Sequence, residues 1–102
     1  MKIVGAAACA AGIAHTYIAK AKLVTAAENA GHEIHIETQG TIGIRDNLTQ
    51  KDIEDADIVV IVADIKISGM DRFKGKKTVE VPTDLVIKSP KNFIKKLESI
   101  IK

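Results

Sequence analysis

Aromatic residues are scarce in this chain, which has no tryptophan, one tyrosine and two phenylalanines, or 3% of 102 residues. So few rings exclude a platform on which nucleic-acid bases would stack. An excess of one charge is missing as well, because the formal net charge is only +2 and the densest basic cluster, at 74–77, holds three lysines. Such a balance is typical of a solvated surface. We therefore expect no nucleic acid among the partners.

Long hydrophobic stretches are also absent. The longest uninterrupted apolar run that fits one structural element is Ile58–Ala63, far short of the ~20 residues of a membrane-spanning helix. The stretch from Ile3 to Ile13 resembles a signal segment that would be cut before a lipid-modified Cys9. That cut would leave an apolar region shorter than the ~7–15 residues of a signal, with Lys2 as the single basic residue before it. We therefore expect no membrane-spanning helix.

Cysteine is nearly absent, since Cys9 is the only one. A lone cysteine has no partner for an internal disulfide, which fits the reducing cytoplasm as the location. The lack of a C-x-x-C pair excludes thioredoxin-type redox chemistry. His32 and His35 are three residues apart in a predicted strand and so face opposite ways. We interpret both as surface residues and expect neither a metal site nor a cofactor.

The sequence does contain enough apolar material for one modest core, because 46% of its residues are hydrophobic and 27% are charged. That composition excludes a disordered chain, and the length suits a single domain over residues 1–102. Two segments are apolar after a charged first residue, as in strands buried on both faces, and two alternate, as in half-exposed strands. The apolar strands are Lys2–Ala8 and Asp57–Ala63, and the alternating strands are His32–Glu37 and Thr78–Val81.

Three helices are expected, the first over 14–30 with a stop signal at Gly31. Its residues at helical spacing are Ala19, Leu23, Ala26 and Ala30. Thr49 is placed to cap a second, short helix through Asp52, and Ser89 to cap a last helix that starts with Pro90. The residues expected to face inward from these two helices are Ile53 and Ala56, and then Phe93, Leu97, Ile100 and Ile101. Loops are predicted at Gln39, Gly40 and Gly43, and over 68–75.

This alternation of strands and helices predicts an α/β fold, a single-domain Rossmann-like three-layer sandwich with helices flanking a four-stranded parallel sheet. The two apolar strands belong in its centre and the two alternating strands at its edges, which gives the order 2-1-3-4. Ligands of such sheets bind beyond the carboxyl ends of the strands, at the switch point next to the first strand. Cys9 follows that strand directly.

The residues after the first strand suit phosphoryl chemistry. Backbone N–H groups of Ala10–Thr16 can converge on an anion at the N-terminus of the first helix. The same field lowers the pKa of a thiol, and Gly12 lets the backbone approach phosphoryl oxygens closely. A thiolate in such a cradle is suited to attack phosphorus and to hold the resulting thiophosphate. The dinucleotide pattern G-x-G-x-x-G and the P-loop ending G-K-[ST] are both missing, and a buried structural cysteine remains the alternative.

Two motifs resemble those of one family. The segment Cys9–Thr16, C-A-A-G-I-A-H-T, is similar to the C-P-T-G-I-A-H-T phosphorylation motif of fructose-family IIB components of sugar phosphotransferase systems (PTS). Glu37–Gly40, E-T-Q-G, is similar to the motif after their second strand, and Ala63–Ile65 lies where they carry a similar segment. The resemblance covers nearly the whole chain.

The resemblance implies a phosphotransferase with a phosphocysteine intermediate. Cys9 would accept a phosphoryl group from a phosphohistidine on a IIA protein or domain. It would then pass the group to a sugar, by family default fructose, bound by the membrane component IIC. The resemblance also implies that the chain associates with a membrane only through IIC. The implied fold is the same four-stranded parallel sheet, and we expect a monomer.

The motif is not kept in full, because Ala10 and Ala11 stand where proline and threonine are usual. Losing proline removes a constraint on the unbound loop, and losing threonine removes a hydroxyl donor. The nucleophile and the backbone cradle remain. The phosphate-binding loop is then expected to consist of Ala10, Ala11, Gly12, Ile13, Ala14, His15 and Thr16, with Gln39, Gly40 and Asp64 at its rim.

His15 and Asp64 each have two interpretations. His15 either donates a hydrogen bond to the phosphoryl group or orients the loop. Thr16 is expected to brace the loop or the thiolate, with passive packing as the alternative. Asp64 either orients loop donors or forms a turn. Two other functions also stay open: a cysteine phosphatase of the low-molecular-weight type and a non-catalytic regulatory module. Such phosphatases carry C-x₅-R-[ST], and His15 takes the place of that arginine here.

Overall fold

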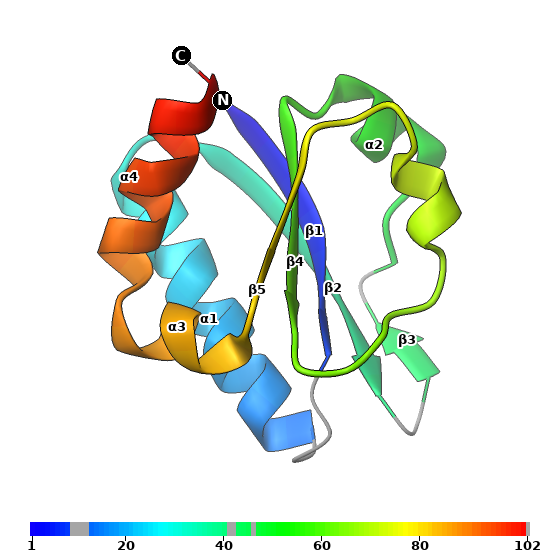
Figure 1. The fold of residues 1–102 in the computed structure, drawn as a ribbon, viewed down its shortest axis with the longest axis horizontal. Coiled ribbons are helices and arrows are strands. Elements are labelled where there is room, and N and C mark those ends of the chain that lie inside the picture. Colours follow the sequence, from blue (N-terminus) through cyan, green and yellow to red (C-terminus); the bar gives the residue numbers. More distant parts are fainter. Residues whose placement is uncertain (9–12, 41–42, 46, 102) are drawn as a thin grey trace.

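The computed structural model describes residues 1–8, 13–40, 43–45 and 47–101, and its centre is one mixed sheet (Figure 1). The strands are β1 (Lys2–Ala8), β2 (Glu33–Gly40), β3 (Gly43–Arg45), β4 (Ile58–Ala63) and β5 (Thr78–Val81). Their order is β3-β2-β1-β4-β5, and every neighbouring pair is parallel except β2 with β3. The predicted parallel order 2-1-3-4 is thus confirmed as β2-β1-β4-β5.

Strand β3 corrects the predicted loop at Gln39, Gly40 and Gly43. Gln39 and Gly40 continue β2, because Gln39 pairs with Ala8 on β1 and so keeps its place in the ladder. Gly40 pairs with Gly43 of the antiparallel strand β3. The second predicted strand is therefore not an edge along its whole length, since β3 covers its carboxyl end.

The helices form the two outer layers of the sandwich. They are α1 (Ile13–Asn29), α2 (Gln50–Asp55), the 3₁₀ turn η1 (Met70–Phe73), α3 (Thr83–Lys88) and α4 (Pro90–Ile101). Figure 1 shows α1, α3 and α4 on one side of the sheet and α2 on the other. Each face has its own apolar core, with Leu23, Phe93 and Leu97 in the first and Ile53, Ile67 and Phe73 in the second. Within the described ranges, no helix combines the length and the apolar character that crossing a membrane requires.

The capping prediction for the second helix is confirmed. The Thr49 hydroxyl accepts a hydrogen bond from the Asp52 backbone N–H at 3.1 Å, and the Asp52 carboxylate accepts one from the Thr49 N–H at 3.1 Å. This reciprocal pair satisfies two of the N–H groups that a helix start leaves without partners. Ile53 and Ala56 are buried as expected.

Other helix predictions need correction. Helix α3 was missed. The last helix starts at Pro90 as predicted, and Ser89 before it is also the C-cap residue of α3, with its carbonyl accepting from the Phe93 N–H at 3.1 Å. In α4, Phe93 and Leu97 face inward as predicted, but Ile101 is 37% exposed and Ile94 is buried instead. Ile94 lies one residue from Phe93 and three from Leu97, so the buried stripe is centred nearer the start of the helix than expected. Ala30 lies beyond the end of α1 and is exposed.

The two central strands approach each other closely at Gly5. A Cβ atom built on Gly5 would lie 1.9 Å from the backbone carbonyl oxygen of Val60 on β4. Only glycine fits such an approach without moving the backbone. Gly5 therefore helps to set the position of β1, whose end carries the candidate site.

Candidate active site at the carboxyl edge of the sheet

Ala8 marks the middle of the carboxyl edge. It pairs with Gln39 on β2 and with Ala63 on β4, and its carbonyl accepts a hydrogen bond from the Asp64 N–H at 3.1 Å. The next residue in the chain is Cys9. The candidate nucleophile thus follows the central strand at the point where three carboxyl ends lie side by side, which is where ligands of such sheets bind.

The predicted phosphate loop is described only in part. Its first members, Cys9, Ala10, Ala11 and Gly12, lie outside the described residues. Helix α1 begins at Ile13, so only four residues separate it from the end of β1. The backbone of Ile13, Ala14 and His15 is helical, and Thr16 is buried with 2% of its surface exposed. The first turn of α1 has no acidic residue, so its own side chains place no negative charge in the field of the helix N-terminus.

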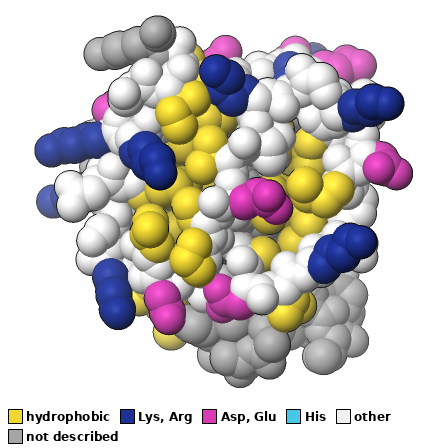
Figure 2. All heavy atoms as spheres, viewed as in Figure 1, with side chains coloured by type: hydrophobic (Ala, Val, Ile, Leu, Met, Phe, Trp, Pro, Cys, Tyr) yellow, Lys and Arg dark blue, Asp and Glu magenta, His cyan; other side chains and the backbone are white. Residues whose placement is uncertain are grey.

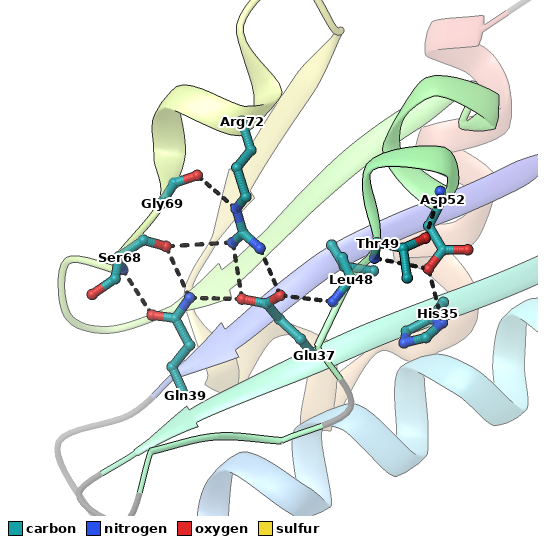
Figure 3. A network of polar contacts seen from close by, with 9 residues as sticks. All are labelled: His35, Glu37, Gln39, Leu48, Thr49, Asp52, Ser68, Gly69 and Arg72. Carbon is teal, nitrogen blue, oxygen red and sulfur yellow. Dashed lines mark hydrogen bonds and ion pairs between the residues drawn. The ribbon is translucent and has the colours of Figure 1, made fainter.

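A network of polar side chains lies beside this edge, and we call Glu37, Gln39, Ser68 and Arg72 the polar frame (Figure 3). Glu37 is its centre and is completely buried. Arg72 binds it with both terminal nitrogens, Nη1 to Oε1 at 2.8 Å and Nη2 to Oε2 at 2.9 Å. The Leu48 N–H and the Gln39 amide donate to the same carboxylate at 3.1 and 2.8 Å. Four donors thus compensate one buried negative charge.

Gln39 ties β2 to the segment that follows β4. Its Oε1 accepts from the Ser68 N–H at 2.8 Å, and its Nε2 donates to the Ser68 carbonyl at 2.9 Å. The carboxamide therefore pairs with Ser68 much as a neighbouring strand would. Arg72 holds the same segment through a hydrogen bond from Nε to the Gly69 carbonyl at 2.8 Å.

The prediction of a half-exposed second strand was wrong for Glu37, because the alternation placed this residue on the exposed face. That face is instead covered by the second core, which includes Leu48, Ile67 and Phe73. The predicted strand ended at Glu37 and placed Gln39 in a loop, whereas in β2 the two residues are two apart and so share one side of the strand. The sequence held no signal that Arg72, 35 residues further on, would pair with Glu37, and this pair was missed as part of the site.

The pKa of Glu37 reflects two opposing effects. Burial alone would raise it, but the hydrogen bonds from Arg72, Gln39 and the Leu48 N–H, together with the charge of Arg72, lower it below the ordinary value of 4.5. The hydrogen bond to Glu37 correspondingly raises the pKa of Arg72. Glu37 therefore stays ionised in the folded protein at pH values where free glutamic acid takes up a proton.

This lowered pKa predicts a pH dependence of stability. The contribution of Glu37 is complete above the ordinary pKa of 4.5 and is lost as the pH falls through the lower pKa of the folded state. Between these two values the unfolded chain binds the proton more readily, so acid favours unfolding. Urea unfolding of wild type and Glu37→Gln from pH 7 to pH 2 tests this. The stability gap between them should be constant above about pH 5 and shrink below it, and a gap independent of pH would contradict the assignment.

Asp64, a predicted rim residue, holds the start of α3. Its Oδ1 accepts from the Thr83 N–H at 3.0 Å and its Oδ2 from the Thr83 hydroxyl at 2.6 Å. Pro82, the N-cap residue of α3, provides no side-chain cap, so a carboxylate from the end of β4 does so. The structure places Gln39, Gly40 and Asp64 at one edge, since Gly40 ends β2 beside them.

The two histidines that were weighed as metal ligands lie apart, and both are partly buried rather than fully at the surface. His32, with a side chain 13% exposed, binds Glu98 on α4 at 2.6 Å, and His35 lies 3.8 Å from Asp52. Within the described part of the chain, no three His, Cys, Asp or Glu side chains are close enough together to hold a metal ion.

Comparison with known proteins agrees with this geometry. The family model for the "PTS system, Lactose/Cellobiose specific IIB subunit" matches residues 4–96. The PTS fructose-like EIIB component 2 of Escherichia coli is 40% identical over 98 residues, which are 96% of this chain and 92% of that protein. The solution structure of a PTS enzyme IIB subunit from Escherichia coli has a TM-score of 0.91 and 36% identity, covering 98% of this chain and 93% of the other.

Longer proteins contain a similar segment. The PTS fructose-specific EIIB'BC component of Vibrio cholerae is 44% identical over 85% of this chain, and the aligned part is only 15% of its length. The match to the family model and the identity to fructose-like EIIB proteins over nearly the whole chain agree with the four-stranded parallel core. The chain belongs to the fructose-family IIB components of the sugar phosphotransferase system.

Proposed function

We propose that this chain is a phosphoryl carrier and that Cys9 is the residue that carries the group. The observation that supports this most is the place of Cys9 in the chain. It follows β1 at the middle of the carboxyl edge and precedes the N-terminus of α1 by four residues. A thiolate and a phosphoryl group are both stabilised at such a helix start. Residues 1–102 would act as one IIB domain, in the cytoplasm, where the lone thiol stays reduced.

The proposed reaction has two transfers. In the first, the Cys9 thiolate attacks the phosphorus of a phosphohistidine on a IIA protein, an S–P bond forms as the N–P bond breaks, and the imidazole takes up a proton. In the second, a sugar hydroxyl bound by IIC attacks that phosphorus, the S–P bond breaks, and Cys9 leaves as thiolate while the hydroxyl proton passes to a base. Ala10–Thr16 would bind the phosphoryl oxygens through backbone N–H groups in both steps.

Exposed apolar side chains indicate where the partners would dock. Among the side chains that the structure describes, seven large apolar ones are exposed, and six of these come within ten residues after the carboxyl end of a strand. They are Tyr17 and Ile18 on α1, Ile44 on β3, Ile65 and Met70 after β4, and Leu85 on α3. Figure 2 shows hydrophobic surface on the helical α3–α4 side and on the α2 side of the molecule. Both IIA and IIC must reach one sulfur, so we propose that they use overlapping parts of this edge in turn.

We propose fructose as the sugar. The similar Vibrio cholerae protein is named fructose-specific and the Escherichia coli protein fructose-like, whereas the family model is named for lactose and cellobiose. The relatives align with 85–96% of this chain at 40% identity or more, so their names carry more weight for the sugar than the broader family description.

Arg72 argues against the phosphatase alternative. The chain has two arginines, Arg45 and Arg72, and a phosphatase would use one to clamp phosphoryl oxygens. Both terminal nitrogens of Arg72 bind Glu37, and its Nε binds the Gly69 carbonyl. This guanidinium is therefore committed to the polar frame.

Two assays together test the proposed function. Membranes containing a fructose-family IIC, supplied with a phosphorylated IIA protein, should form fructose phosphate only when this chain is added. Mannose and mannitol serve as comparison sugars. The same preparation should not turn over an aryl phosphate, because His15 replaces the phosphatase arginine and a lost donor of that kind costs roughly 10²–10³ in rate.

The outcomes separate the alternatives. Rapid aryl phosphate hydrolysis by wild type would favour the phosphatase. Sugar phosphorylation that does not depend on this chain, with no label on Cys9, would favour a non-catalytic module.

A further inference from the structure

We propose that the polar frame is a positioning device for phosphoryl transfer at Cys9. Its hydrogen bonds fix the 64–69 segment against the carboxyl end of β1. The positioning residues are Glu37, Gln39 and Arg72, and none of them is proposed to touch the phosphoryl group. The inference rests on the proposed carrier function and adds how the geometry of that transfer is kept.

Gln39 connects the polar frame with the strand that precedes Cys9. Ala8, the residue before Cys9, is the ladder partner of Gln39. The Gln39 backbone therefore fixes β1, while its carboxamide holds both backbone polar groups of Ser68. One residue thus joins the strand that leads to Cys9 with the segment that follows β4.

The 64–69 segment is held at both ends. At its start, the Asp64 N–H binds the Ala8 carbonyl and the Asp64 carboxylate binds Thr83. At its other end, Gln39 binds the N–H and the carbonyl of Ser68, and Arg72 binds the Gly69 carbonyl. Between the two anchors, Ile67 is buried and Ile65 is 45% exposed. The segment is therefore held at both ends, and Figure 3 shows the contacts at Ser68 and Gly69.

The backbone at Gly69 is restricted to a conformation that suits glycine. Its φ of +79° lies in the left-handed region that favours glycine. A Cβ atom there would lie 2.7 Å from the Arg72 Nε, so the turn is shaped to let the guanidinium approach. The Arg72 fork then reaches Glu37, which in turn receives the Gln39 amide. The same hydrogen bonds therefore fix both the orientation of the Gln39 side chain and the path of the 64–69 segment.

The chemistry explains why a polar frame suits this place. A buried ion pair adds little net stability compared with apolar residues of similar volume, and the two apolar cores already hold the sheet. The directional hydrogen bonds of the polar frame instead define one arrangement of the segments that they join. Transfer between two proteins depends on such an arrangement, because a misplacement of about 1 Å at a reacting centre can cost 10²-fold in rate.

The test is single-turnover transfer from a fructose-family IIA protein, phosphorylated on its histidine, to wild type, Arg72→Lys and Gln39→Met. Lysine keeps the charge but cannot form the fork, and methionine keeps the length of glutamine without its hydrogen bonds. Lys76→Met is the matched control. Lys76 lies in the same stretch of chain, yet its ammonium binds the Glu54 and Ala56 carbonyls near the end of α2.

We expect both frame variants to lower the rate constant at saturating donor by about 10-fold or more, with the donor concentration at half-maximal rate unchanged within about twofold. Lys76→Met should transfer at the wild-type rate. The double variant should be little slower than either single one, because the frame acts as a unit. Thermal unfolding of each variant fixes an assay temperature at which all are folded.

Other outcomes overturn the inference in distinguishable ways. Wild-type rates in both frame variants would remove the positioning role and leave the carrier function intact. An equal loss of transfer rate in Lys76→Met would also remove the positioning role, since it indicates a structural effect. A weaker affinity of the frame variants for the donor, with no change in rate constant, would do the same, since it indicates a docking role. Wild type that accepts no phosphoryl group would overturn the carrier function and this inference with it.

Discussion

Replacing Arg72 with methionine should lower the free energy of unfolding by about 3–5 kcal/mol, because it leaves a buried charge without its partner. Glu37 is completely buried, and Arg72 provides two of the four hydrogen bonds to its carboxylate. Methionine keeps an unbranched side chain that can lie over the Phe73 ring, 4.8 Å from the guanidinium carbon of Arg72. The lost stability then reports the charge pair more than the packing. Urea unfolding at pH 7 measures it.

A double variant provides the control. In Glu37→Gln with Arg72→Met, the buried group is neutral and can still accept from the Leu48 N–H. We expect this variant to be more stable than Arg72→Met alone. A loss below about 1 kcal/mol in the single variant, within the range of exposed ion pairs, would contradict the view that Glu37 depends on Arg72.

Much of the fold was predictable because the strongest local patterns agree with the tertiary structure. Ile58–Ala63 is apolar throughout, Lys2–Ala8 is apolar after Lys2, and both strands lie at the centre of the parallel sheet. Thr49 and Asp52 form the expected reciprocal cap. These features are set by neighbouring residues in the chain, or by burial on both faces, and both leave a trace in the sequence.

The errors have a common physical cause, which is contact with distant segments. Gln39 and Gly40 looked like a loop, but pairing with β1 and β3 keeps them in a strand. Glu37 looked exposed because alternation indicates which residues share a face and not what covers that face. Helix α3 was missed because its side-chain cap comes from Asp64, 19 residues before Thr83.

The position of Cys9 in the chain was easier to predict from the sequence than the polar frame beside it. The place of Cys9 follows from the order of a buried strand, small residues and a helix, all of which are adjacent in the sequence. The polar frame joins residues 37, 39, 68 and 72 from different parts of the fold, so no local sequence pattern predicts it.

Replacing Cys9 with serine should abolish fructose phosphate formation, a drop of roughly 10⁴-fold or more, as for the loss of a covalent nucleophile. A thiol can ionise near neutral pH at a helix N-terminus, whereas a hydroxyl there stays protonated and attacks phosphorus poorly. The change is nearly isosteric, so the fold and the docking surface should be kept. Unchanged thermal unfolding and retained binding of IIA would show that the loss lies in the chemistry. Sugar phosphorylation within about 10-fold of wild type would rule out Cys9 as the carrier.

Mapping the phosphoryl group after incubation with a phosphohistidine donor tests the central claim most directly. The wild-type protein should carry one phosphoryl group on the peptide that contains Cys9, and tandem mass spectrometry should assign it to sulfur. The label should disappear in Cys9→Ala and when fructose and IIC-containing membranes are added. A phosphoryl group found on His15, His32 or His35, or label that survives in Cys9→Ala, would contradict the account.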